Sequence, residues 1–157
     1  MLFTILPVKP MKKIFRTLLL GLTLVCMSIL SVNAQQEVFG DYTVHYIAVN
    51  SNFISPEIAE QYDIVRSPRN AFLNISVIKN TGGTGTAVSA TISGEKANFI
   101  GQREDITFIE VREGDAIYYL GQFEFSNAEN LRFNIEIQPE NSGPVYPLSW
   151  TTQLYIN

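Results

Sequence analysis

The stretch LRFNIEIQ, residues 131–138, decides the fold class. Apolar and polar side chains alternate through all of it, with Leu131, Phe133, Ile135 and Ile137 in the apolar positions. Successive side chains of a β-strand point to opposite faces, so one face of this segment is apolar and the other polar. The pattern predicts a strand of an antiparallel sheet that is packed on one face and wet on the other.

Similar β-rich runs recur along the chain between turn signals. One run, Ile106–Arg112, has apolar residues in both phases, which predicts either a bulge or two buried faces. With residues 131–138 the runs give seven strands, and we expect an all-β, seven-stranded immunoglobulin-like antiparallel β-sandwich. The predicted core residues are Leu131, Phe133, Ile135, Trp150 and Leu154. The further strand segments are Tyr42–Val49, Asn70–Lys79, Val88–Ser93, Ile106–Arg112, Ala116–Phe125 and Tyr146–Ile156.

One short helix is predicted from Pro56 to Tyr62. Ser55 can cap it, and proline suits its first position. Glu57 and Glu60 favour the positive N-terminal end of a helix dipole. The glycine-rich segment Thr81–Gly85 is expected to form a flexible turn between two strands.

The N-terminal residues have the pattern of a secretory signal peptide. Three basic residues within 12–16 follow Met11, the expected start, and precede the uncharged apolar run Leu18–Leu30. The small-residue box Val32–Ala34 then supplies a cleavage site before Gln35. The apolar run has 13 residues, fewer than the ~20 needed to span a bilayer. We expect export to the periplasm and no stable membrane anchor after cleavage.

Cleavage divides the chain into a signal peptide, residues 1–34, and a single domain, residues 35–157. That domain has 7 basic and 15 acidic residues, a net charge of −8. Such acidity argues against nucleic acid or an anionic membrane as a partner. Lipidation at Cys26 is disfavoured because Val25, rather than a small residue, precedes it.

The composition of residues 35–157 restricts the possible metal chemistry. Cys26 and every methionine precede the cleavage site, and His45 is the single histidine. Zinc and copper sites are usually built from several His, Cys or Met ligands. The sequence therefore predicts no metal site and no cofactor.

Five residues are candidates for a binding surface. Three lie at or near the polar face of the strand Asn70–Lys79, and two flank the turn near residue 114. Arginine and tyrosine often dominate binding energy at protein interfaces. We expect a non-catalytic binding or interaction module with a periplasmic or envelope protein as its partner and an undetermined oligomeric state. The candidates are Arg66, Asn74, Ser76, Arg112 and Tyr118.

Two alternatives remain at the level of sequence. Glu110, Glu113 and Asp115 cluster around a turn and could form the paired carboxylates of a small hydrolase. Glu110 and Arg112 are also neighbours on one strand face, which indicates an ion pair. The second alternative is a carbohydrate- or lipid-binding module, since exposed aromatic side chains can stack on sugars.

Several segments resemble a known family. They are GDYTVHY at 40–46, Arg66-Ser67 followed by LNISV at 73–77, EVREGDAIYY at 110–119 and LRF at 131–133. Together they resemble domain-of-unknown-function family 4426 of proteobacterial exported proteins, over nearly all of residues 35–157. The resemblance implies a small periplasmic domain and brings no catalytic residue or cofactor with it.

Overall fold

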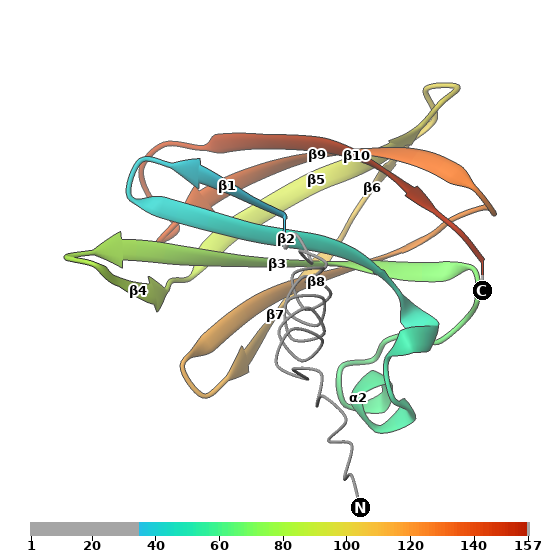
Figure 1. Cartoon of the computed structure of the whole chain (residues 1–157), viewed down its shortest axis with the longest axis horizontal. Coiled ribbons are helices and arrows are strands. Elements are labelled where there is room, and N and C mark those ends of the chain that lie inside the picture. Colours follow the sequence, from blue (N-terminus) through green and yellow to red (C-terminus); the bar gives the residue numbers. More distant parts are fainter. Residues whose placement is uncertain (1–34, 157) are drawn as a thin grey trace, which may run out of the picture. The chain divides into compact units, whose positions relative to one another are not determined.

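The computed structural model describes residues 35–156, so the predicted signal peptide lies outside the described residues. Within them the chain forms two antiparallel sheets and one short α-helix, which confirms the predicted β-sandwich (Figure 1). The described part contains ten strands rather than the expected seven. Sheet A has the order β1 (Gln35–Phe39), β2 (Tyr42–Asn50), β3 (Asn70–Thr81), β8 (Ala116–Glu124), β7 (Phe108–Glu113), with β4 (Thr84–Ala87) beside the far end of β3. Sheet B has the order β10 (Tyr146–Leu154), β9 (Glu129–Pro139), β5 (Ala90–Asn98), β6 (Arg103–Asp105).

The main core lies between the two sheets. The apolar face of β9 is 0–1% exposed, and it packs against the inner face of sheet A. Phe133 lies at the centre of this contact. Its ring centroid is 5.2 Å from that of Phe123 in sheet A and 4.9 Å from that of Trp150 on β10. Leu131, Phe133, Ile135 and Leu154 are buried as predicted, whereas Trp150 is half-buried at the edge of the core.

Three strands were not predicted, namely β1, β4 and the three-residue β6. Strand β1 is exposed and mostly polar, and so has no alternation that marks a buried face. Strand β4 follows the glycines expected to make a flexible turn. Gly82 and Gly83 have φ of +61° and +88°, which forms a tight two-residue connection, and Thr81 then pairs with Thr84.

The segment with apolar residues in both phases crosses from one sheet to the other. Strand β6 pairs with β5 in sheet B, and β7 pairs with β8 in sheet A. Ile106 is buried in the main core, and its amide donates to the Gly94 carbonyl at 2.8 Å. Val111 is buried on the opposite face of sheet A. Two buried faces therefore explain the ambiguous phase.

The helix α2 (Pro56–Gln61) covers part of the outer face of sheet A, the face that points away from sheet B. It follows the 3₁₀ turn η1 (Ser51–Phe53), and the predicted Ser55 side chain caps it by accepting the Ile58 amide at 3.4 Å. A second apolar cluster forms beneath the helix. Its buried members are Ala59, Ile64, Phe72, Val111 and Leu120. Among residues 35–156, no helix has the length and apolar character needed to cross a membrane.

Candidate functional site

A pocket of about 290 Å³ opens on the outer face of sheet A beside α2. We call it the outer-face pocket. Its walls are mostly apolar and come from α2 and the segments that flank it and from strands β3, β7 and β8. The lining residues are Ile54, Ile58, Tyr62, Ile64, Phe72, Asn74, Val111, Glu113, Tyr118 and Leu120.

Two polar groups stand out among these walls. The Asn74 Oδ1 atom is buried and has no hydrogen-bond partner among the described residues. The Tyr62 hydroxyl donates to Glu113 Oε1 and accepts from Gln61 Nε2 at 3.0 Å. The hydrogen bond to Glu113 raises the pKa of Tyr62 above its usual value. A buried acceptor without a donor is costly, so the pocket offers Asn74 Oδ1 to an incoming donor group.

Apolar side chains remain exposed around this pocket. Ile47, Asn74, Leu120 and Ile109 form one row across four strands of sheet A. The two ends of the row, Ile47 and Ile109, are 44% and 41% exposed. Ile58 on α2 is also 41% exposed. The helix thus covers the middle of the sheet face and leaves apolar groups open on its flanks.

The structure brings three of the five predicted binding residues together. Asn74, Ser76 and Tyr118 share the outer face of sheet A. Asn74 pairs with Leu120, and residues two positions apart on a strand point to the same face, as Ser76 does with Asn74 and Tyr118 with Leu120. Arg112 lies on the opposite face of β7, because it is one residue out of phase with Val111 and Glu113. Arg66 lies in the loop after α2, where its guanidinium donates to the Asn52 carbonyl at 3.4 Å. The proposed five-residue surface is therefore divided among three places.

The same alternation separates the carboxylates of the hydrolase hypothesis. Glu113 contacts Tyr62 on the outer face, whereas Glu110 contacts Tyr119 on the inner face. Glu110 is occupied by two donors, the Tyr119 hydroxyl at 2.7 Å and Arg112 Nε at 2.6 Å. The first of these bonds, with help from Arg112, lowers the pKa of Glu110. A general acid needs a raised pKa and a carboxylate partner across one substrate bond, so this geometry opposes the hydrolase hypothesis.

Glu110 belongs instead to a network that closes one side of the sandwich. The Tyr119 hydroxyl, which donates to Glu110, also accepts the Ala90 amide of sheet B at 2.6 Å. Arg112 donates onward to Ser89 Oγ at 2.5 Å. Burial raises the pKa of Tyr119 to about 12 from the ordinary value of 10.0. The network links the two sheets through polar contacts where the apolar core ends.

Tyr119 is expected to make the domain sensitive to alkaline pH. Folding favours its protonated form, so this contribution is complete below pH 10 and is lost as the pH rises through about 12. A shift of that size corresponds to ~2–3 kcal/mol. Urea unfolding at about pH 9 and about pH 11.5 should show a steeper loss in the wild type than in Tyr119→Phe. Equal losses in the two proteins would contradict the assignment to Tyr119.

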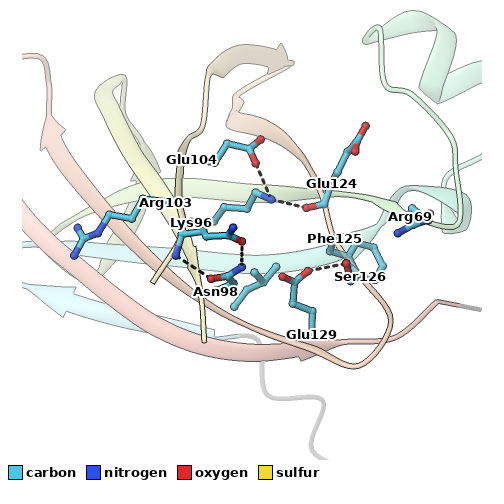
Figure 2. Close-up of a pocket in the computed structure, with 11 residues that line it drawn as sticks. Arg69, Lys96, Asn98, Arg103, Glu104, Glu124, Phe125, Ser126 and Glu129 are labelled. Atoms are coloured by element: carbon cyan, nitrogen blue, oxygen red, sulfur yellow. Dashed lines mark hydrogen bonds and ion pairs between the residues drawn. The ribbon is translucent and has the colours of Figure 1, made fainter. Parts of the chain in front are cut away.

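A second pocket, of about 260 Å³, lies at one end of the sandwich (Figure 2). We call it the end pocket. Lys96 of β5 is central to it and is only 12% exposed. Its ammonium binds Glu104 Oε2 at 2.9 Å and the Glu124 carbonyl at 2.6 Å, and it lies 5.8 Å from the centre of the Phe123 ring. The sequence analysis missed this pocket because its residues come from four separate segments and form no motif.

The fold and these pockets define a small two-layer β-sandwich domain with concave sites on its surface. The chain belongs to the family described as "Domain of unknown function (DUF4426)", which matches residues 36–157. This confirms the resemblance. No curated protein matches the sequence.

Two proteins of known structure have a similar fold. A DUF4426 family protein from Pseudomonas aeruginosa PAO1 is 30% identical, with a TM-score of 0.68, over 78% of this chain and 95% of that chain. FetP of uropathogenic Escherichia coli is 12% identical, with a TM-score of 0.57, over 78% of this chain and 93% of that chain. A copper-bound variant of FetP aligns over 76% of this chain with the same identity and TM-score.

Proposed function

We propose that this domain is a non-catalytic periplasmic module that binds another envelope protein through the outer face of sheet A. The main supporting observation is the buried, unpartnered Asn74 Oδ1 inside an apolar pocket. The exposed Ile47, Ile58 and Ile109 surround that pocket and would be covered in a complex. Aromatic and apolar groups around a few fixed polar groups are typical of binding surfaces.

The charge around the pocket suggests the chemistry of the partner. Glu57, Glu60 and Asp63 lie on or beside α2, and Glu113 lines the pocket itself. Hydrogen bonds from the Ser55 side chain and the Glu57 backbone lower the pKa of Glu57, and Arg66 in the loop after α2 adds to this effect. The partner should therefore present an apolar side chain, an N–H or O–H donor for Asn74, and basic residues at the rim.

The proposed compartment rests on two observations. Residues 1–34 have the basic, apolar and small-residue segments of a signal peptide. FetP, which has a similar fold, was recombinantly expressed in the periplasm of Escherichia coli BL21(DE3). Both support a periplasmic location for the domain.

Copper binding is not part of the proposal, although one FetP structure contains copper. Residues 35–156 bring together no group of three His, Cys, Asp or Glu side chains that could hold a metal ion. The single His45 would have to act without a Cys or Met ligand. Copper prefers imidazole and sulfur ligands, so the residues present do not fit a FetP-like metal role.

Photo-crosslinking in cells can test the proposed surface. A photoreactive amino acid placed at Ile47 or Ile109 should give a discrete adduct with one envelope protein, whereas the same group at Thr151, exposed on sheet B, should not. The partner is then identified by mass spectrometry and purified. Adducts of equal yield at all three positions, or none at Ile47 and Ile109, would contradict the proposal.

Tyr118→Ala should weaken the affinity for that purified partner by ~10-fold or more, as expected for a central tyrosine in an interface. Thr151→Ala is the matched control and should bind like the wild type. Thermal unfolding of both variants accompanies the measurement. If Tyr118→Ala lost binding only in proportion to the unfolded fraction, Tyr118 would be a structural residue and the proposal would fail at this position.

A further inference from the structure

The end pocket combines fixed charges of both signs in a small volume. Lys96, Arg69 and Arg103 supply the cations, of which Arg103 is paired with Glu95 at 2.6 Å, and Glu104, Glu124 and Glu129 supply the carboxylates. A domain with a net charge of −8 thus contains a local region in which the signs balance. A simple anion would meet three carboxylates there, and a simple cation would meet three basic groups. A ligand that carries both charges avoids either repulsion.

Lys96 is held in place before any ligand arrives. An ammonium group has three donors, and two of them are used by Glu104 and the Glu124 carbonyl. The third has no partner among the described residues. In Figure 2 the Lys96 ammonium lies between these two acceptors at the centre of the pocket. A largely buried cation with a remaining donor is suited to a carboxylate.

A tight turn fixes the opposite charge. The Ser126 amide donates to Glu129 Oε2 at 2.6 Å, and the Glu129 amide donates to the Ser126 carbonyl at 3.1 Å. These two bonds close the turn and leave Oε1 of Glu129 without a partner among the described residues. Figure 2 shows this carboxylate directed toward Ser126, beside Phe125. The position of one negative charge is therefore set by the backbone.

Arg69, the residue before β3, completes the pocket. Its carbonyl accepts the Phe125 amide at 2.9 Å and its amide donates to Ser67 Oγ at 3.2 Å, so its backbone is fixed. Its guanidinium is exposed and has no hydrogen bond or ion pair within residues 35–156. In Figure 2 Phe125 lies between the Arg69 guanidinium and the Lys96 ammonium. Guanidinium groups bind carboxylates through two parallel hydrogen bonds.

We propose that the end pocket binds a free α-amino acid. Its carboxylate faces the open donor of Lys96, its ammonium faces Glu129, and Arg69 adds an exposed positive charge on the other side of Phe125. The volume of about 260 Å³ suits a single amino acid, since pockets for larger ligands start near ~300 Å³. The end pocket shares no lining residue with the outer-face pocket. Amino-acid binding and protein binding can therefore be tested independently of each other.

NMR titration of the protein purified from the periplasm tests the proposal. The twenty common L-amino acids are added singly, with acetate and methylammonium as probes that carry one charge each. At least one amino acid should shift the amide signals of Lys96 and residues 126–129 saturably, with ~10-fold higher affinity than either single-charge probe. If no amino acid binds at millimolar concentration, or acetate binds as tightly, the proposal is wrong.

Two variants separate the charges from the fold. Glu129→Gln keeps an oxygen that can accept the Ser126 amide but removes the negative charge, and Arg69→Gln removes an exposed cation. Glu129→Gln should weaken amino-acid binding ~10-fold or more, Arg69→Gln should weaken it by a smaller factor, and both should leave the melting temperature unchanged. Arg132→Gln, an exposed cation on the outer face of sheet B, is the matched control. An equal loss of binding in Arg132→Gln would show a nonspecific charge effect and overturn the assignment.

Discussion

Phe133→Ala is expected to destabilise the domain by ~3–5 kcal/mol, the range for a buried phenylalanine truncated in a core that cannot collapse. Phe133 is 0% exposed. Its ring packs against Phe123 from sheet A and Trp150 from β10, so the truncation opens a cavity where the two sheets meet. Urea denaturation at neutral pH, followed by tryptophan fluorescence, measures the change in midpoint.

Phe99→Ala is the matched control for this measurement. Phe99 lies after β5 and is 92% exposed, so the same truncation removes almost no buried area there. Its unfolding midpoint should equal that of the wild type. An unchanged midpoint in Phe133→Ala would mean that β9 presents its other face to the core, which would contradict the register between β9 and β10.

The position of Phe133 was predictable because alternation alone sets which face of β9 is apolar. The same alternation holds in β3, where Leu73 and Ile75 are buried, and in β8, where Phe123 is buried. A one-residue shift in register would expose all of them, so the pattern and the fold agree. The helix α2 was predictable for a different reason, since its cap and proline act locally.

The crossing at Ile106 and Thr107 was beyond the sequence pattern. Ile106 belongs to the main core and Val111 to the cluster beneath α2, so the apolar residues of this segment serve two different layers. Periodicity shows that both phases are apolar. It does not show which sheet each residue joins, because that depends on long-range pairing with β5 and β8.

The candidate site was predictable only in part. Asn74, Ser76 and Tyr118 share a face because of strand alternation, which the sequence contains. That α2 folds over this face, buries Phe72 and leaves a pocket beside Asn74 depends on tertiary packing. The end pocket is assembled from Arg69, Lys96 and the turn at 126–129, which are far apart in the chain. No spacing rule connects such residues.

Gly94→Ala is expected to cost about 3 kcal/mol, the upper part of the range for overpacking. Gly94 of β5 pairs with Ile135 of β9. An added Cβ would lie 2.5 Å from the Asn134 carbonyl oxygen and 2.9 Å from the Ile135 Cα. Backbone atoms cannot rotate away as a side chain can, so β5 must move away from β9 and the hydrogen bond from Ile106 to Gly94 is strained.

Gly85→Ala in β4 distinguishes this close backbone approach from the general effect of replacing a glycine. The Cβ there would meet Ile78 Cγ2 at 2.8 Å, a methyl branch of a half-buried side chain, whereas the close atoms at Gly94 include backbone. Its cost should stay below ~1 kcal/mol, since alanine also reduces the entropy of the unfolded chain.

Lys96 lies two residues after Gly94 and pairs with Phe133, so a displaced β5 also moves the ammonium of the end pocket. Gly94→Ala should therefore lower the urea midpoint and shift the Lys96 amide signal even under native conditions. A midpoint equal to that of Gly85→Ala would show that the two strands can separate at no cost, and that Lys96 is not held by the pairing of β5 with β9.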